Sequence, residues 1–319
     1  IILFAVQILN FAGTKKDILI IESYNQEYGW DASYIEGIRQ VLGQKYKLHF
    51  FEMDTKRLPQ SQFSKRAEMA WGLFKQIKPE LLIIGDDNAL KYLSKEIVKI
   101  RTPVVYLGIN NNPRNYQVTG FKHISGVLER PLLKRSITFI NEFHKIKKVL
   151  VMFDSSTTAK VTKAEVFNNK DSLILDGIQV DIRMIGKLDK WQKAVSSAKQ
   201  DGYDAIIVGL YHNLVDSSGK HVKADRVLKW TSQNTPIPPF SFWSFSVGPD
   251  KTIGGYVCFG MAQGRAAAKM ALKFLKRENK GIIRPEFVRT GHFFFSKSQL
   301  KKWKLILPAI FESKAIFEY

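Results

Sequence analysis

Cysteine is almost missing from this chain of 319 residues, which contains Cys258 alone. A single thiol excludes a disulfide within the chain and a metal site built from several cysteines. Cys258 stands in an apolar run, residues 256–259, with no histidine or basic residue beside it. Because a reactive thiolate needs such a neighbour to lower its pKa, we expect Cys258 to be a small buried hydrophobic residue.

Recurrent catalytic motifs are missing as well. The chain has no Gly-x-Gly-x-x-Gly after its first predicted strand, no Gly-Lys-Ser/Thr phosphate loop, no His-Glu-x-x-His and no Gly-x-Ser-x-Gly. Its six histidines are scattered without a metal-ligand spacing, and only His212 follows a predicted strand. We therefore predict a protein that is not an enzyme and holds no metal and no cofactor. The carboxylate pair Asp86 and Asp87 leaves one alternative, an enzyme that acts on a small anionic substrate.

Acidic residues are few for the number of basic ones. Asp plus Glu is 29 and Lys plus Arg is 49, a formal net charge of +20. The basic residues are spread along the chain in pairs, without the long basic run or the zinc-finger spacing of nucleic-acid-binding proteins. We expect no nucleic-acid partner, and a solvated basic surface suited to an anionic membrane or polysaccharide nearby.

No apolar run reaches the ~20 residues that a spanning helix needs. The chain starts with an apolar stretch at 1–11, followed by Ala12 and Gly13. A short apolar stretch before small residues is typical of the end of a signal peptide, so residues 1–13 are predicted to be a signal-peptide or anchor remnant. The protein would then be periplasmic or extracellular, free or membrane-anchored, with a membrane-associated partner. A buried first helix is the alternative.

Short apolar runs alternate with helical periodicities at roughly thirty-residue spacing, which is typical of a doubly wound α/β sheet. Continuous runs at 18–21, 81–84, 149–153 and 205–208 indicate parallel strands buried on both faces. The run at 178–184 alternates apolar with polar residues, so we expect an edge strand there.

The alternation runs twice, which predicts two lobes. The first set occupies residues 17–118, and the stretch 117–129 is a plausible crossover to the second. A late helix at 262–277 packs on the first lobe if the chain crosses back. The predicted domains are lobe one from 17–118 plus 254–282 and lobe two from 123–247 plus 288–319. A single enlarged α/β domain is the alternative.

Polar and aromatic residues gather at the carboxyl ends of the predicted strands, where open α/β sheets bind their ligands. Hydroxyls, amides and carboxylates can hydrogen-bond a polar ligand while rings cover its apolar faces. The candidate ligand-binding residues are Ser23, Tyr24, Asn25, Tyr28, Trp30, Asp86, Asp87, Asn88, Asn110, Asn111, Asp154, Ser155, Thr157, Tyr211 and Trp243. Asn88, Ser155 and Thr157 stand where helix N-caps are expected and could serve only as caps. Tyr28 and Trp30 could equally be packing residues.

In these residues the chain resembles the type I periplasmic substrate-binding proteins of ABC transporters, and especially the branch also found as sensor domains of bacterial signalling proteins. The matching stretches are Ser23 and Tyr24 with Tyr28 and Trp30, then residues 53–57, 85–89, 103–111, 125–129 and 260–264. One residue departs from the pattern, since the branch often carries histidine where this chain has Asn25.

The resemblance implies two Rossmann-like lobes, joined by a three-segment hinge, that close on a ligand. It implies an extracytoplasmic solute-binding protein that captures a small polar molecule, aromatic and carboxylate-bearing ones included, and presents it to an ABC permease. A ligand-binding sensor domain with a signalling partner is the alternative that the same resemblance carries.

Overall fold

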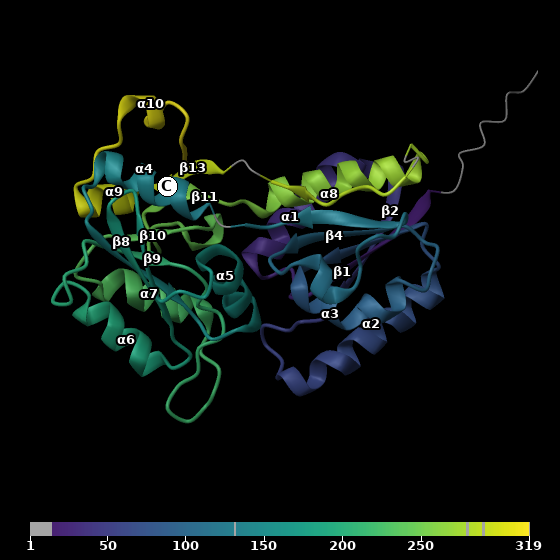
Figure 1. The fold of residues 1–319 in the computed structure, drawn as a ribbon, viewed down its shortest axis with the longest axis horizontal. Coiled ribbons are helices and arrows are strands. Elements are labelled where there is room, and N and C mark those ends of the chain that lie inside the picture. The colour runs from purple at the N-terminus through teal and green to yellow at the C-terminus, as the bar shows by residue number, and fades with distance from the viewer. Residues whose placement is uncertain (1–14, 131, 279–280, 289–290, 319) are drawn as a thin grey trace, which may run out of the picture.

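The computed structural model describes residues 15–130, 132–278, 281–288 and 291–318. These residues form two α/β lobes that lie side by side, each built around its own sheet (Figure 1). The predicted fold class of two doubly wound lobes is confirmed, and a single enlarged sheet does not form. The predicted signal-peptide or anchor remnant at 1–13 lies outside the described residues.

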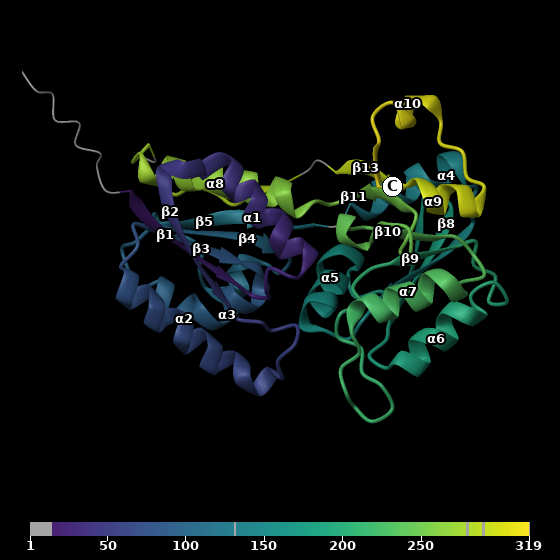
Figure 2. The ribbon, with the colours of Figure 1, turned by 180° about the vertical axis from the view of Figure 1, so that it is seen from behind.

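Six parallel strands form the sheet of the first lobe, in the order β12–β5–β4–β3–β1–β2. Their bounds are β1 Lys16–Glu22, β2 Tyr46–Glu52, β3 Leu81–Gly85, β4 Val104–Ile109, β5 Ile124–Leu128 and β12 Glu286–Phe287. Helices α1 (Gly29–Leu42) and α8 (Gly260–Leu275) cover one face, and α2 (Phe63–Ile77) and α3 (Asp86–Ile97) cover the other (Figure 2). Because both faces are covered, the strands read as continuous apolar runs.

Helices α1 and α8 lie against each other although more than 200 positions separate them in the chain. Glycines set how closely they approach. A Cβ atom on Gly37 would lie 2.2 Å from the carbonyl oxygen of Met261, and one on Gly264 would lie 1.9 Å from that of Tyr34. No side chain fits at either position, so glycine lets the two backbones touch. The late helix packs on the first lobe, as predicted.

The second lobe has a five-stranded sheet in the order β10–β9–β6–β8–β7. Its strands are β6 Lys148–Phe153, β7 Ser172–Leu175, β8 Ile178–Met184, β9 Ala205–Val208 and β10 Pro239–Ser241. Helices α6 (Leu188–Ser197) and α7 (Ala224–Asn234) pack on one face, where Trp191 is fully buried. Helices α4 (Leu133–Phe143) and α5 (Thr157–Phe167) pack on the other face.

The strand at 178–184 is not the edge strand that its alternation predicted. β7 pairs antiparallel with it on the outer side and takes the edge position. Asp176 and Gly177 connect the two strands, with φ of 49° and 83°. A two-residue Asp-Gly turn with both φ angles positive is a favoured hairpin connection, so the local sequence did contain the signal for the extra strand.

A small third sheet joins three short strands near the C-terminus: β11 Gly254–Val257, β13 His292–Ser296 and β14 Ile316–Glu318. It lies with the second lobe, next to α9 (Lys297–Trp303) and α10 (Ala309–Glu312) (Figure 1). A Cβ atom on Gly254 would lie 1.9 Å from the carbonyl oxygen of Phe294, so this glycine allows β11 to pair tightly with β13.

The lobe boundaries therefore differ from the predicted ones at two places. β5 pairs with β4 in the first sheet, so residues 124–128 belong to lobe one and not to the predicted lobe two. β11 pairs with β13, so residues 254–257 belong to lobe two and not to the predicted lobe one. The chain crosses between the lobes three times: after β5, between β11 and α8, and between β12 and β13. Both strands are short and contain glycine, which is why the sequence pattern alone did not indicate them as strands.

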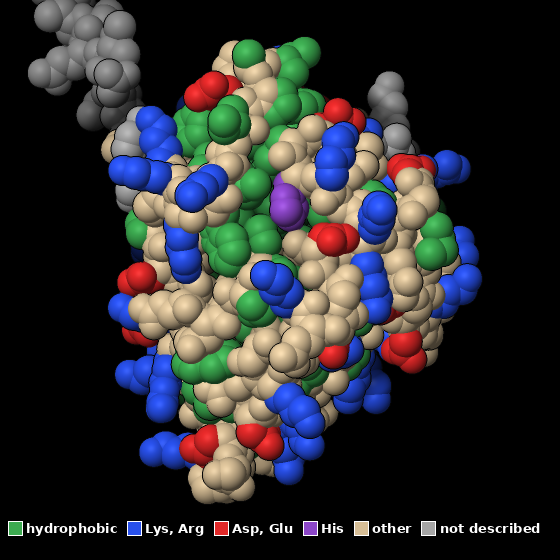
Figure 3. All heavy atoms as spheres, turned by 90° about the vertical axis from the view of Figure 1, so that its left-hand side faces the viewer, with side chains coloured by type: hydrophobic (Ala, Val, Ile, Leu, Met, Phe, Trp, Pro, Cys, Tyr) green, Lys and Arg blue, Asp and Glu red, His purple; other side chains and the backbone are tan. Residues whose placement is uncertain are grey.

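Lysine and arginine side chains are dispersed over the one face of the protein that Figure 3 shows. Figure 3 looks onto the end of the second lobe, where they are scattered over the whole face and not gathered in one patch. Among the described residues, no helix is both long and apolar enough to cross a membrane.

Candidate ligand-binding site

Both lobes contribute to an enclosed space at the carboxyl ends of the two sheets, which we call the inner chamber. Its lining residues from lobe one and the first hinge segment are Tyr24, Tyr28, Trp30, Lys56, Asp86, Asn110 and Glu129, and those from lobe two are Thr158, Leu210 and Trp243. Its volume is only about 10 Å³, about the space of one water molecule. The lobes are therefore closed on each other, and a metabolite can enter only if they separate.

Two tryptophans hold the two carboxylates of the inner chamber. Trp30 Nε1 donates to Asp86 Oδ1 at 3.1 Å, and Trp243 Nε1 donates to Glu129 Oε1 at 2.5 Å. The other oxygen of Glu129 accepts from Asn110 Nδ2 at 2.9 Å. The other oxygen of Asp86 is buried and has no hydrogen-bond partner among the described residues. Glu129 is thus satisfied, whereas Asp86 retains an acceptor for a further donor.

The fold explains why these side chains meet. Asp86 directly follows β3 and Glu129 directly follows β5, at the same edge of the parallel sheet. Asp86 has φ of 66°, a left-handed conformation that is costly for a residue with a side chain. In this conformation its carboxylate bonds to Trp30, a residue that is 3% exposed.

Besides the bond from Trp243 to Glu129, two hydrogen bonds between described residues join the lobes at the inner chamber. Tyr24 Oη and Thr158 Oγ1 are 3.2 Å apart, and Thr162 Oγ1 donates to Asn110 Oδ1 at 3.4 Å. Thr158 and Thr162 lie on α5 of lobe two, one helical turn apart. The closed arrangement thus depends on side chains that the two lobes share.

Lys56 is the buried cation of the inner chamber. Its side chain is 8% exposed, and Nζ lies 4.4 Å from the ring centroid of Tyr24 and 4.9 Å from that of Tyr28. These are cation–π distances. Burial lowers the pKa of Lys56, and the nearby carboxylates, Asp154 first and then Asp86, oppose this shift. Within the described part of the chain no carboxylate lies within ion-pair distance of Nζ.

Burial dominates the electrostatics of the chamber. It raises the pKa of Asp86 well above its ordinary value, and the neighbouring Asp31 raises it further. It also raises the pKa of Glu129 to about 7, against the hydrogen bonds from Trp243 and Asn110. Low-dielectric surroundings penalise the charged form of each carboxyl group, so a ligand that brings a compensating positive charge would lower both pKa values again.

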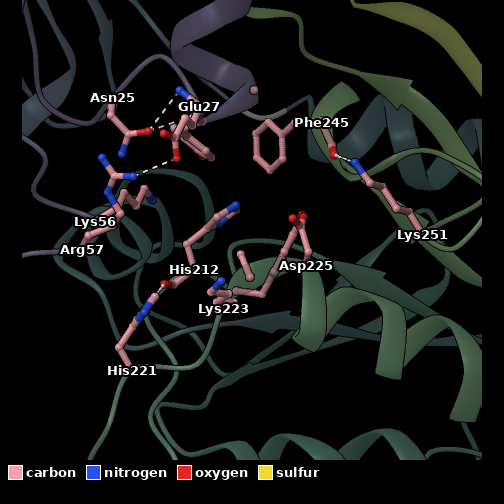
Figure 4. A pocket seen from close by; sticks show the side chains of 14 residues that line it. Asn25, Glu27, Lys56, Arg57, His212, His221, Lys223, Asp225, Phe245 and Lys251 are labelled. Carbon is pink, nitrogen blue, oxygen red and sulfur yellow. Dashed lines mark hydrogen bonds and ion pairs between the residues drawn. The ribbon is translucent and has the colours of Figure 1, made fainter.

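A second and larger cavity, the outer pocket, opens beside the inner chamber and shares Tyr28 and Lys56 with it. Its volume is about 650 Å³, within the range of small-molecule sites. Asn25, Glu27 and Arg57 of lobe one line one side, and His212, His221, Lys223, Asp225, Phe245 and Lys251 of lobe two line the other (Figure 4). Arg57 pairs with Glu27 at 2.8 Å, while burial lowers the pKa of His212 well below its ordinary value.

The fifteen residues proposed from the sequence fall into separate groups. Six of them line the inner chamber: Tyr24, Tyr28, Trp30, Asp86, Asn110 and Trp243. Three line a side groove between the lobes, namely Asn88, Ser155 and Thr157. Tyr211 lines the outer pocket together with Asn25 and Tyr28, and Asn111 lines a surface hollow beside α3.

The remaining candidates have structural partners. Ser23 donates to Gly85 O and accepts from the amide of Ala89, so it ties β1 to the start of α3. Asp87 accepts from the amides of Asn110 and Asn111 and from the hydroxyl of Tyr116. Asp154 accepts from the amides of Ser156 and Asn213. Asn25 of the outer pocket has structural partners as well, since it accepts from the amides of Glu27 and Tyr28. The adjacent carboxylates Asp86 and Asp87 thus point to different surroundings.

Four chamber residues were not among the proposed ones: Lys56, Glu129, Thr158 and Leu210. Two of them stood in stretches that carried the resemblance, since Lys56 lies within 53–57 and Glu129 ends 125–129. Glu129 was overlooked because β5 before it was read as a crossover. Had β5 been recognised, the rule of strand carboxyl ends would have selected Glu129 directly.

The comparisons with known proteins find similar structures and no matching sequence. No family model and no curated protein matches the chain. Three solved structures are similar to it over most of their length. A Streptococcus pneumonia ABC domain in complex with L-Trp shows 16% identity and a TM-score of 0.67, over 96% of this chain and all of the other. A ligand-free, open substrate-binding protein with adhesive properties from Clostridium difficile shows 14% and 0.65, over 95% and 100%.

The third is a leucine-binding protein from Thermotoga maritima, with 14% identity and a TM-score of 0.52 over 83% of each chain. At such identities the likeness concerns the fold. The chain has the two-lobed fold of the type I periplasmic binding proteins.

Proposed function

We propose that this protein is an extracytoplasmic solute-binding protein that captures a small polar molecule between its lobes and presents it to an ABC permease. The observation that carries the proposal is the inner chamber, where residues of both lobes enclose buried carboxylates and aromatic rings. Buried polar groups of this kind are costly unless a partner satisfies them, and one oxygen of Asp86 still lacks a partner among the described residues.

Closure provides the mechanism. A ligand that touches Asp86 of lobe one and Thr158 of lobe two contacts both lobes only when they are closed. Such a ligand binds the closed state more tightly than the open one, and this difference in affinity is what shifts the open–closed balance. A permease can then distinguish the loaded protein by its closed shape. The protein performs no chemistry on the ligand and releases it unchanged.

The proposal is tested by calorimetry with a library of amino acids, amines, sugars, nucleosides and carboxylates. We expect one chemical class to bind. Asp86→Asn in lobe one and Thr158→Val in lobe two should each weaken that ligand, the second by about 3- to 10-fold for one lost hydrogen bond. Lys65→Met, at an exposed position of α2, serves as the control variant.

Three results would count against the proposal. A folded protein that binds nothing in the library would remove the solute-binding role. A ligand recovered chemically altered after incubation would favour the enzyme alternative. A ligand whose affinity depends on one lobe only would remove the closure mechanism.

A further inference from the structure

The inner chamber contains more carboxyl groups than basic groups, and its cation belongs to the protein itself. Asp86 and Glu129 line the chamber at 2% and 3% exposure, and Lys56 is the one lysine or arginine among the described lining residues. Four rings, those of Tyr24, Tyr28, Trp30 and Trp243, complete the lining. Aromatic faces next to carboxylates form a preferred environment for an organic ammonium group.

Lys56 Nζ occupies this environment without forming an ion pair. It rests against the rings of Tyr24 and Tyr28, and no hydrogen-bond partner of Nζ exists among the described residues. A buried ammonium normally acquires such partners, because an unsatisfied charge is costly. The position is nevertheless fixed by the backbone, since the amide and the hydroxyl of Thr55 both donate to Ser23 O. The fold therefore positions this lysine at the chamber, where two aromatic rings and no hydrogen bond among the described residues hold its head group.

On this basis we propose that the ligand of the chamber carries an ammonium group, which binds at Asp86 and displaces the Lys56 ammonium from the aromatic rings. This inference rests on the proposed solute-binding function and names its ligand class. Lys56 then acts as a tethered competitor that fills the site in the empty protein. The free oxygen of Asp86 accepts from the ligand's ammonium, while its other oxygen stays bonded to Trp30 Nε1.

The geometry also gives Lys56 a place to go. Its side chain lines the outer pocket as well as the inner chamber, and the outer pocket has a volume of about 650 Å³. A displaced Lys56 can therefore turn outward into this pocket without unfolding the loop that carries it. The closed chamber holds only about one water molecule, so the lobes must separate before a ligand can enter. The outward movement of Lys56 then leaves its place beside the rings to the ligand.

The first experiment uses a matched series of probes. Tryptamine carries an ammonium group without a carboxylate, L-tryptophan carries both, indole-3-propionate carries a carboxylate alone, and myo-inositol is neutral. We expect calorimetric binding only among the probes with an ammonium group. Binding of indole-3-propionate or myo-inositol without any ammonium probe would overturn this inference and leave the solute-binding function standing. If neither these probes nor any member of the wider library binds, the solute-binding function itself is overturned.

The second experiment separates displacement of Lys56 from direct binding by Lys56. Lys56→Met keeps an unbranched side chain that is one atom shorter and removes its charge. If Lys56 competes with the ligand, the affinity of the ammonium probe rises by about 3- to 30-fold, the range of one cation–π interaction. If Lys56 holds a carboxylate of the ligand, the affinity of L-tryptophan falls, and the proposed displacement is wrong.

Asp86→Asn completes the test. It should weaken the ammonium probe by about 10- to 100-fold through the loss of a charged hydrogen bond. The asparagine can keep the bond from Trp30, so the variant should remain folded, which its unfolding midpoint will show. Lys65→Met is the matched control for the loss of a lysine charge, and its affinity should equal that of the unchanged protein. An unaltered affinity in Asp86→Asn would exclude the proposed role of Asp86.

Discussion

The hydrogen bond between Tyr24 and Thr158 offers a direct test of the closed arrangement, because it joins lobe one to lobe two. Tyr24→Phe removes one hydroxyl and keeps the ring. Burial raises the pKa of the Tyr24 hydroxyl well above its ordinary value, so the group is neutral at every pH of interest. The oxygens are 3.2 Å apart, longer than a typical hydroxyl–hydroxyl bond, so we assign the bond the lower part of the usual range, about 0.5–1 kcal/mol. The open population should then rise by about 2- to 5-fold.

Energy transfer between dyes on the two lobes measures this population. Lys65 on α2 and Lys193 on α6 are exposed, and replacing each with cysteine places one dye on each lobe. The native thiol should not react, because burial raises the pKa of Cys258 to about 12. The measurement is made without ligand on the unchanged sequence and on Tyr24→Phe, Thr158→Val and the double variant.

The double variant supplies the decisive comparison. Tyr24→Phe and Thr158→Val remove the same hydrogen bond, so the double variant should open no further than either single variant. Effects that simply add would show that the two side chains act independently, and the reasoning from the observed contact would fail. Low transfer efficiency in the unchanged protein would show that the closed arrangement is not the main state of the free protein.

Three further predictions concern stability and reactivity. Burial raises the pKa of Glu22 to about 7, so the contribution of this group to stability is complete below the unfolded pKa near 4.5 and is lost as the pH rises through 7. Glu22→Gln should therefore raise the free energy of unfolding at pH 8, by up to about 3 kcal/mol, and leave it nearly unchanged at pH 4. Unfolding in urea at the two pH values measures both. Gly264→Ala should lower the free energy of unfolding by about 3 kcal/mol or more, since a Cβ would lie 1.9 Å from a carbonyl oxygen. Gly72→Ala on α2, where a Cβ would have nothing within 4 Å, should raise it by up to about 1 kcal/mol. Equal effects of the two substitutions would contradict the close contact of α1 and α8. Cys258 should resist iodoacetamide at pH 7.5 in the folded protein and react after unfolding, and rapid modification of the folded protein would show that the thiol is accessible.

The amino-acid sequence by itself determined the local elements of this protein. Runs such as 18–21 and 81–84 are apolar on both faces, and only a strand covered on both sides buries such a run completely. The same runs located the carboxyl ends of the strands, and thereby Trp30, Asp86, Asn110 and Trp243 at the inner chamber.

The tertiary structure decided which neighbours those elements acquire. Asp86 and Asp87 are adjacent and chemically alike, yet Asp87 is held by two backbone amides and a tyrosine while Asp86 faces the chamber with one oxygen free. β5 became a strand through its partner β4, and Lys56 became a buried cation through rings that converge on it. The periodicity of apolar residues in the sequence indicates which face of its own helix or strand each residue occupies. The free energy of a buried charge depends on groups from distant segments, and only folding brings those together.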